Sequence, residues 1–316
     1  MYYLGIDLGG TNIAIGIVDE NYKIVKKGST PTLSDRDLEE VVKDIASLSL
    51  KLLDEAKIDI SEIAHAGIGS PGSIDPENGV VISSNNIKMY NYPIVDVLKK
   101  YLPIENIYVD NDANAAALGE AMGGAAKGAE TAVMVTLGTG VGSGIIIHGK
   151  IFGGFNHAGG EIGHMVIEHD GWQCTCGRKG CWETYSSATG LAKMTREKLL
   201  ETKDTVMWDM VGGDINDASA RTPFAAMKQG DKAGKEVVDK YVSYLSCGIT
   251  NIINIFQPNV LCIGGGVANE GRYLLDPIIE IVERDQYTHG YDIKTKICVA
   301  ELGNDAGIIG AAAITH

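Results

Sequence analysis

The sequence predicts a mixed α/β protein built from two similar halves, and two observations lead to this prediction. The first is a repeat, because a short apolar run, a glycine turn and a second apolar run occur at residues 2–18 and again at 132–147. Leu8-Gly9 in the first copy aligns with Leu137-Gly138 in the second, which indicates an internal duplication. The second is the length of 316 residues, which suffices for about two domains that each bury a core.

The expected elements of the first half alternate between strands and helices. Two apolar runs, 2–7 and 13–18, predict a hairpin around Leu8-Gly9-Gly10-Thr11-Asn12. Apolar residues at three- and four-residue steps then predict an amphipathic helix over 38–56. Further along we expect strands at 63–68 and 107–110, a turn at 75–79 and an alanine-rich helix at 113–126.

The second half begins with the repeated strand, turn and strand. A long helical pattern follows from about 233 to 256 and ends at Gln257-Pro258. A buried strand at 260–263 then runs into Gly264-Gly265-Gly266. The remainder predicts a helix at 273–283, a strand at 294–300 and a helix of small residues at 305–314.

Composition and charge exclude several classes of protein. Apolar residues make up 45% and charged residues 22% of the chain, which is ordinary for a globular protein and excludes disorder, collagen and coiled coil. The net charge of −14 opposes binding to nucleic acid or to an acidic membrane. The longest apolar region, 241–268, contains Asn251, Asn254 and Pro258 and is not a membrane span. Because the N-terminus lacks a signal sequence, we expect a cytoplasmic protein.

Three glycine clusters each follow a predicted strand: Gly9-Gly10-Thr11, Gly138-Thr139-Gly140-Val141-Gly142 and Gly264-Gly265-Gly266. Glycine at a strand end lets backbone N–H groups approach phosphate oxygens, although each cluster alone is also explained by a tight hairpin. The pattern G-x-x-x-x-G-K-[ST] is absent from the sequence. Residues 67–72 match G-x-G-x-x-G, but a turn follows them where a dinucleotide site needs a helix.

Two aspartates are candidates for chemistry. Asp7 precedes the first glycine turn, where a carboxylate orients Mg²⁺ beside phosphates, or simply caps the turn. Asp112 lies in the run Asn111-Asp112-Ala113-Asn114 between a strand and a helix. Asn111 or Asp112 serves there as the helix cap, and Asp112 is also placed to accept a proton in a phosphoryl transfer.

His164, Cys174, Cys176 and Cys181 have the spacing of a metal site. Three thiolates and one imidazole form a closed tetrahedral zinc set, the alternative being reduced free thiols. Four protein ligands leave no position for water, so the zinc should be structural and should fix the loop that carries Glu161, His164 and Glu183. We expect Cys247 and Cys262, which lie in apolar runs, to be core residues.

These motifs together resemble the ROK family of bacterial sugar kinases and sugar-responsive repressors. The resemblance rests on Asp7-Leu8-Gly9-Gly10-Thr11, on the run from Asn111 to Glu120, on Gly160-Glu161-Ile162-Gly163-His164 and on the Cys-x-Cys-Gly-x-x-Gly-Cys run. It covers essentially the whole chain and is strongest toward the glucokinases. It implies an actin-like, ribonuclease H-like ATPase fold with two duplicated domains and a cleft. The expected domains are a smaller one, 1–115 with the C-terminal helix 303–316, and a larger one, 116–302, with the zinc-binding loop at 161–183.

The resemblance also implies a role for each motif in the transfer of phosphate from MgATP to the 6-hydroxyl of glucose. Asp112 would be the base, and His164 would bind both zinc and sugar. The sugar residues would be Asn86, Asn111, Asp112, Glu161, His164 and Glu183, with Asn85 as the alternative to Asn86. The nucleotide residues would be Asp7, Gly9, Gly10, Thr11, Asn12, Gly138, Thr139, Gly140, Gly264, Gly265 and Gly266.

Other functions remain to be weighed against glucose phosphorylation. The same chemistry on N-acetylmannosamine, N-acetylglucosamine, fructose or mannose is one alternative, because pocket volume is not readable from sequence. A sugar-sensing repressor is another, but it would need a DNA-binding domain before the first glycine turn, and six residues precede Asp7. Apart from the sugar we expect no nucleic-acid or membrane partner, and the resemblance implies a homodimer or homotetramer.

Overall fold

The computed structural model describes residues 1–315, and it divides into two compact units. Unit 1 comprises Met1–Met134, Gly144–Gly160 and Ala300–His316, and unit 2 comprises Val135–Ser143 and Glu161–Val299. Residue 316, the last of the expected C-terminal helix, lies outside the described residues. This division differs from the expected one, because the boundary expected after residue 115 falls inside the helix α3 (Asp112–Gly123), which packs against the C-terminal helix within unit 1.

The first sheet has five strands in the order β3-β2-β1-β4-β8. β1 pairs antiparallel with β2 and parallel with β4, and β4 pairs parallel with β8. The strands are β1 Tyr2–Leu8, β2 Asn12–Asp19, β3 Ile24–Pro31, β4 Ile63–Ser70 and β8 Ile107–Asn111. The hairpin and the strands expected at 63–68 and 107–110 are therefore confirmed, whereas β3 was not expected.

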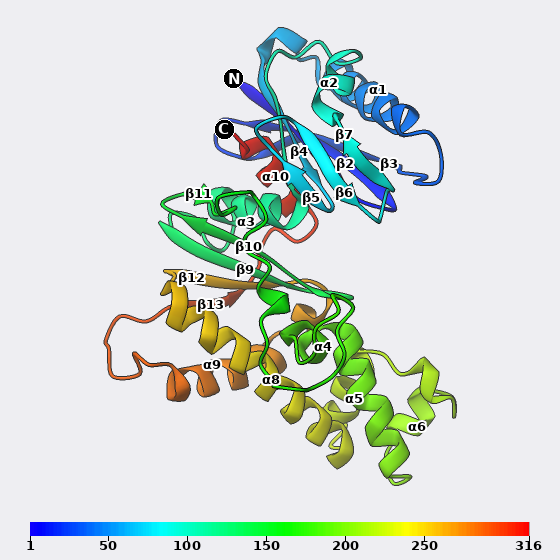
Figure 1. Cartoon of the computed structure of the whole chain (residues 1–316), viewed down its shortest axis with the longest axis vertical. Coiled ribbons are helices and arrows are strands. Elements are labelled where there is room, and N and C mark those ends of the chain that lie inside the picture. The colour runs from blue at the N-terminus through cyan, green and yellow to red at the C-terminus, as the bar shows by residue number, and fades with distance from the viewer. Residues whose placement is uncertain (316) are drawn as a thin grey trace. The chain divides into compact units, whose positions relative to one another are not determined.

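Side chains alternate between the two faces of this sheet. Leu4, Ile6 and Leu8 of β1 point into the main core of unit 1 together with residues of α1 (Leu38–Ala56). That core also contains residues of α2 (Ile94–Lys99) and of a second, antiparallel sheet. The second sheet is formed by β5 Ser73–Asp75, β6 Val80–Ser84 and β7 Met89–Tyr92, and the short helix η1 spans Ile60–Glu62. Figure 1 shows these elements on one side of the first sheet.

The opposite face of the sheet is covered by α10 (Asp305–Ala313), which packs against β1, β4 and α3. Glycines make this approach close. A Cβ on Gly5 would lie 1.9 Å from the carbonyl oxygen of Ile308, and a Cβ on Gly67 would lie 1.8 Å from that of Ala311. The expected small-residue helix is thus confirmed, and its small residues let three elements share one narrow space.

A five-stranded sheet also follows in the second half, in the order β11-β10-β9-β12-β13. When only the strands of each sheet are counted in chain order, both sheets have the order third, second, first, fourth and fifth, so the internal duplication is confirmed. β12 pairs parallel with β13. The strands are β9 Thr131–Leu137, β10 Val141–Ile147, β11 Lys150–Ile151, β12 Val260–Gly264 and β13 Lys296–Val299.

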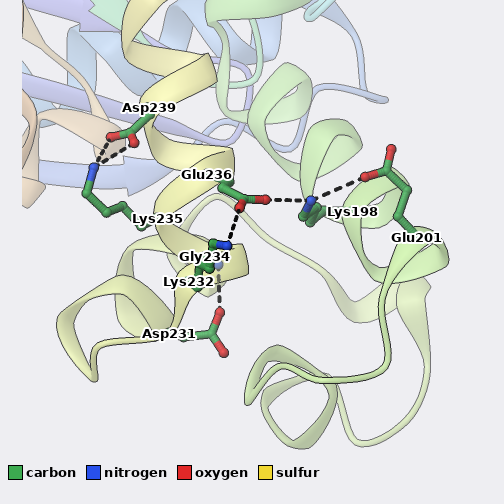
Figure 2. A network of polar contacts seen from close by, with 8 residues as sticks. All are labelled: Lys198, Glu201, Asp231, Lys232, Gly234, Lys235, Glu236 and Asp239. Carbon is green, nitrogen blue, oxygen red and sulfur yellow. Dashed lines mark hydrogen bonds and ion pairs between the residues drawn. The ribbon is translucent and has the colours of Figure 1, made fainter.

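Unit 2 contains most of the helices of the second half (Figure 1). The longest, α8 (Lys232–Phe256), begins at the N-cap Asp231, whose carboxylate accepts a hydrogen bond from the backbone of Gly234. Figure 2 shows that Lys198 of α5 (Ala188–Glu201) joins Glu236 of α8 in an ion pair. The other helices are η2 Ile162–His164, α4 Trp182–Ser186, α6 Met207–Met210, η3 Ile215–Asp217, α7 Arg221–Lys228, η4 Gly266–Glu270 and α9 Arg272–Asp285.

Two cysteine expectations have different outcomes. Cys262 on β12 is buried, as expected. Cys247 is exposed, so its assignment to the core is wrong; the amphipathic helix α8 presents it on the outer side while Ile249 and Ile252 are buried. None of the helices within residues 1–315 is long and apolar enough to cross a membrane.

Candidate active site

The carboxyl ends of three parallel strands bring two acidic segments together in unit 1. In the sheet register Asp7 faces Gly69, and Gly69 faces Asp110. A Cβ on Gly69 would lie 3.0 Å from the Cβ of Ala115 and 3.6 Å from the Cα of Asp112. The glycine therefore lets α3 begin directly at the edge of the sheet, where Asp112 is near Asp7.

Asn111, and not Asp112, is the cap of α3. Its side-chain oxygen accepts hydrogen bonds from the backbone N–H of Ala113 at 2.8 Å and of Asn114 at 3.3 Å. Its amide nitrogen donates to the carbonyl oxygen of Gly72 at 3.1 Å. The Asp112 carboxylate accepts from the Ala113 N–H at 2.9 Å. Because Asn111 caps the helix, the Asp112 carboxylate is not needed as the cap and keeps capacity to accept a hydrogen bond from another partner.

Burial raises the pKa of both aspartates. The pKa of Asp7 rises from 3.8 to about 6, first through loss of solvent and then through the nearby charge of Asp112. Burial also raises the pKa of Asp112, against the opposing effect of its hydrogen bonds with the Ala113 backbone and the Asn111 side chain. Two neighbouring, partly buried carboxylates disfavour simultaneous ionisation, and a divalent cation would reverse this preference.

A glycine that the sequence analysis missed leaves room for the Asp7 carboxylate. A Cβ on Gly307, in the first turn of α10, would lie 2.6 Å from an oxygen of the Asp7 carboxylate. No other residue fits there without displacing that carboxylate. The available signal was the small-residue composition of the last helix, which predicted close packing but not its partner.

The first glycine turn is fixed by its own backbone and by Thr32. The N–H of Gly9 donates to the carbonyl oxygen of Asn12 at 3.0 Å. Thr32 donates its hydroxyl to the carbonyl of Gly9 at 2.6 Å and its N–H to that of Thr11 at 2.9 Å. Both Thr11 and Asn12 are exposed. The turn is therefore rigid and open, as a phosphate-binding turn requires.

Asn86 lies beside this turn. A Cβ on Gly10 would be 3.2 Å from the Cβ of Asn86. The neighbouring Asn85 instead accepts a hydrogen bond from the hydroxyl of Tyr90 at 3.3 Å. Both asparagines are exposed, but only the position of Asn86 is tied to the glycine turn, which favours it over Asn85 as the site residue.

The second glycine turn, in unit 2, is held by α5 and by Glu183. The Ala188 N–H donates to the carbonyl of Gly138, and the Thr189 hydroxyl donates to that of Thr139, each at 2.8 Å. The Glu183 carboxylate accepts the N–H of Val141 at 2.9 Å. Glu183, expected among the sugar residues, thus supports the turn itself with one of its oxygens.

The third glycine cluster lies against the second within unit 2. A Cβ on Gly265, whose φ is +83°, would come 2.5 Å from the carbonyl oxygen of Leu137. This contact requires glycine. A Cβ on Gly138 or on Gly266 would meet no described atom within 4 Å. Those two residues leave open backbone on either side of the contact, where a ligand can approach.

The predicted metal ligands converge. One ligand atom from each of His164, Cys174, Cys176 and Cys181 lies within 4.8 Å of all the others. The sulfurs of Cys176 and Cys181 are 3.7 Å apart, and Nδ1 of His164 is 3.7 Å from the sulfur of Cys174. Tetrahedral zinc with Zn–S bonds of about 2.3 Å requires sulfurs about 3.8 Å apart. The four residues therefore fit a zinc ion.

The loop that carries the predicted metal ligands is anchored to neighbouring elements of unit 2. A Cβ on Gly163 would lie 2.3 Å from the carbonyl of Val141 on β10, so only glycine allows the loop to pass there. The Trp182 N–H donates to the carbonyl of Met165 at 2.8 Å. Glu161, which precedes η2, is exposed, and Nδ1 of His164 faces the sulfur cluster. Nε2 of His164 is the ring nitrogen left for a ligand.

The predicted site residues form two groups, one in each unit. Unit 1 contains Asp7, Gly9, Gly10, Thr11, Asn12, Asn86, Asn111 and Asp112. Unit 2 contains Gly138, Thr139, Gly140, Glu161, His164, Cys174, Cys176, Cys181, Glu183, Gly264, Gly265 and Gly266. Besides Gly307, sequence reasoning missed Thr32 and Thr189, because a side chain that holds a backbone carbonyl leaves no pattern in the sequence.

Comparison with known proteins gives the family. The sequence profile described as "ROK family" matches residues 3–316. The chain belongs to the ROK family. It is 37% identical to a glucokinase of Thermotoga maritima, over 98% of this chain and 96% of that protein. It is 32% identical to an N-acetyl-D-glucosamine kinase of Vibrio cholerae, over 99% of this chain and 98% of that protein.

Solved structures of ROK proteins share the architecture. A glucokinase from Streptomyces griseus, crystallised with glucose and AMPPNP, matches with a TM-score of 0.79 at 30% identity, over 99% of this chain and 98% of that one. The expected actin-like sugar-kinase fold, with its duplicated mixed sheets, is thereby confirmed for this ROK protein.

Proposed function

We propose that this ROK protein is a glucokinase, which transfers the γ-phosphoryl group of ATP to the 6-hydroxyl of glucose. The observation that carries the proposal is the position of Asp112, a partly buried carboxylate at the start of a capped helix and beside Asp7. Its relatives over nearly the full length of the chain include glucokinases. A loose phosphoryl-transfer transition state needs positioning more than a strong base, and this arrangement supplies it.

Asp112 is the group that accepts the proton of the sugar hydroxyl. The hydroxyl oxygen forms a bond to the γ-phosphorus while the bond to the bridging β–γ oxygen breaks and ADP leaves. Because Asn111 caps the helix, the Asp112 carboxylate is available to face the hydroxyl. Asn86, Asn111, Glu161, His164 and Glu183 are the proposed sugar residues, chosen because amides and carboxylates both pair with hydroxyls.

The glycine turns are the proposed nucleotide residues. Backbone N–H groups around Gly9 to Asn12, Gly138 to Gly140 and Gly264 to Gly266 would meet the phosphates and the adenosine of ATP. Mg²⁺, when bound, neutralises charge on the phosphates, and Asp7 is the carboxylate proposed to orient it. Burial raises the pKa of Asp7 and so stabilises the protonated form of its carboxyl group. Asp7 must lose this proton before it can bind a cation.

Zinc is the proposed occupant of the His164, Cys174, Cys176 and Cys181 cluster, with a structural role. The four side chains would supply all the ligands of a tetrahedral ion and would leave no position for a reacting water. The ion would fix the loop that carries Glu161, His164 and Glu183. Metal analysis of the purified protein should find one zinc per chain, and a value well below one would refute this assignment.

The function is tested by measuring ADP release with MgATP and each of glucose, mannose, fructose, N-acetylglucosamine and N-acetylmannosamine. Glucose should give the highest kcat/KM. Asp112→Asn should lose at least about a hundredfold in kcat while still binding glucose, as expected for loss of a general base. Asp96→Asn, which changes an exposed aspartate in the first turn of α2, is the matched control and should remain active.

N-acetylglucosamine is the second candidate substrate, because a relative at 32% identity over the full length is named for it. Should the acetamido sugar give the highest kcat/KM, the mechanism and the role of Asp112 stand and the glucose assignment falls. Should no sugar release ADP, the catalytic proposal falls as a whole.

A further inference from the structure

The residues assigned so far leave the phosphates of the donor without a basic partner. The site residues of both units include the carboxylates of Asp7, Asp112, Glu161 and Glu183, and none of them is a lysine or an arginine. Phosphoryl transfer develops negative charge on a group that is already anionic, and proteins commonly oppose it with a cationic side chain as well as a metal ion. A lysine or arginine near one of the glycine turns is therefore to be expected.

A cavity of about 330 Å³ in unit 2 reaches the second glycine turn. Its lining includes Thr139 and Gly140 of that turn, Trp172 of the metal-binding loop, and Thr189 and Lys193 of α5. Lys193 is the one basic residue in the lining. The volume lies at the lower end of the range for small-molecule sites, and backbone from a proposed phosphate turn forms part of its wall.

The helix α5 presents Lys193 on the face that contacts the second glycine turn. Thr189 and Lys193 are four residues apart on this helix and so lie on one face, one turn apart. The Thr189 hydroxyl is already hydrogen-bonded to the carbonyl of Thr139 at 2.8 Å, which fixes that face against the glycine turn. Lys193 therefore follows Thr189 along the wall of the cavity.

The ammonium group of Lys193 is held without a carboxylate. Its Nζ lies 3.6 Å from the centroid of the Trp172 ring, and among residues 1–315 it takes part in no ion pair. The Trp172 ring also stacks on Tyr185, with centroids 4.6 Å apart, and the backbone N–H of Trp172 donates to the Tyr185 hydroxyl at 2.6 Å. Glu183 also lines the cavity, but one of its oxygens accepts the Val141 N–H.

We propose that Lys193 is a phosphate-binding residue, and that the cavity beside Thr139 and Gly140 receives the phosphate chain of the donor. Lysine is a compact charge on a flexible stem, so its ammonium can leave the indole face and meet a phosphate oxygen. A cation–π contact keeps the side chain extended and available without the strong competition of a carboxylate. This inference deepens the proposed kinase function and rests on it for the identity of the donor.

The ligand class is a condensed phosphate, and two sources share that chemistry: the tail of a nucleotide and inorganic polyphosphate. The test is calorimetric binding of ADP and of inorganic tripolyphosphate, without sugar, to the wild type and to Lys193→Met. We expect the variant to bind both compounds about tenfold or more weakly, as for loss of a charged hydrogen bond. Lys193→Arg should retain most of the affinity.

The chain offers a matched control. Lys203 also lies over an indole, 3.9 Å from the centroid of Trp208, but neither residue lines the cavity. Lys203→Met should leave both affinities unchanged. Binding should also alter the fluorescence of Trp172 as the ammonium moves away, and Trp172→Phe should abolish that change.

The outcomes are distinct. Weaker binding of both compounds only in Lys193→Met supports the proposal, and tripolyphosphate binding to the wild type shows that the phosphate chain alone suffices. An effect on ADP but not on tripolyphosphate would place Lys193 at the base or ribose and overturn the assignment, as would unchanged affinities or a wild type that binds neither compound. If the wild type binds ADP through Lys193 but phosphorylates no sugar, the kinase proposal fails and the phosphate site stands.

Discussion

Asp7 shows how one residue can serve chemistry at the expense of stability. Its carboxylate is buried between the end of β1 and Gly307, near Asp112, and its pKa is about 6. In the absence of a cation the ionised form is therefore strained by lost solvation and by a like charge. Carboxylates with a pKa raised in this way are typical of functional sites, and here a bound cation would relieve the strain.

Replacement of Asp7 by Asn should stabilise the ligand-free protein at pH 8 while abolishing activity. The amide has nearly the same shape but no charge, so the free energy of unfolding should rise by about 1–3 kcal/mol. Mg²⁺-dependent ADP release should fall by at least about a hundredfold. Denaturant titration and a kinetic assay of the same preparation measure both effects, and a destabilised Asp7→Asn protein would contradict the assigned strain.

The pH dependence of stability follows from the same shift. The pKa of Asp7 is raised from 3.8 to about 6, so the folded protein holds this proton more tightly than the unfolded chain. The resulting stabilisation is complete below about pH 4 and disappears as the pH rises through 6. The Asp7 contribution to the free energy of unfolding should therefore decline between pH 4 and 6, and the difference between wild type and Asp7→Asn should grow over that interval.

At the scale of elements, α10 and α3 are held together by contacts that permit no side chain. A Cβ on Gly310 would lie 1.6 Å from the carbonyl oxygen of Ala115 and 2.8 Å from the N atom of Gly119. These are backbone atoms, which cannot move without shifting a whole helix. Because α3 begins with Asp112, this packing also sets the position of the proposed base.

Gly310→Ala should consequently lower the free energy of unfolding by more than about 3 kcal/mol, since overpacking here involves rigid backbone. Gly123→Ala near the end of α3 is the matched control, because the nearest atom to its Cβ is 3.6 Å away. That helical change should be neutral or stabilising by up to about 1 kcal/mol. Equal effects of the two substitutions on the denaturation midpoint would refute the packing argument.

Glu120 on α3 links that helix to two loops of unit 1. Its side chain is 1% exposed and accepts backbone hydrogen bonds from Ala125, Glu301 and Leu302 at 2.8, 3.2 and 2.8 Å. A carboxylate can accept all three, whereas a glutamine amide turns its donor toward at least one N–H. Glu120→Gln should therefore cost about 1–3 kcal/mol of stability in a denaturant titration, and an unchanged midpoint would contradict this role.

The elements reveal which features a sequence can predict. Apolar spacing predicted α1, β12 and the long α8 nearly to the residue, because burial of one face leaves a periodic trace. The spacing of His164 and the three cysteines likewise predicted that these side chains converge, because they lie close together in the chain. The exposed edge strand β3 and the packing of Gly307 on Asp7 left no such trace, because their partners are distant in sequence.

At the scale of the whole chain, the internal duplication and the path of the chain determine which site residues belong to each unit. The two five-stranded sheets repeat one topology, and each presents a glycine turn between its first two strands. Unit 1 nevertheless draws on three separate segments, including residues 300–316. The resemblance implied a boundary at residue 115 and joined the C-terminal helix to the first domain, but it left most of α3 outside that domain. The pairing of α3 with α10 joins segments that are almost 200 residues apart, so no local pattern in the sequence predicts it.

Zinc removal tests how far one local cluster supports the sugar site. The ion would hold Glu161 and His164 on a loop with little regular structure, so its loss should loosen that loop while leaving the sheets of both units intact. Prolonged treatment with a chelator, or Cys176→Ser, should weaken glucose binding at least about tenfold, and added zinc should restore the chelated wild type but not the variant. Cys247→Ser changes an exposed cysteine outside the cluster and should bind glucose normally. Full glucose affinity in metal-free protein would mean that packing of Gly163 against β10 and of Trp182 against Met165 is enough to order the loop without a metal.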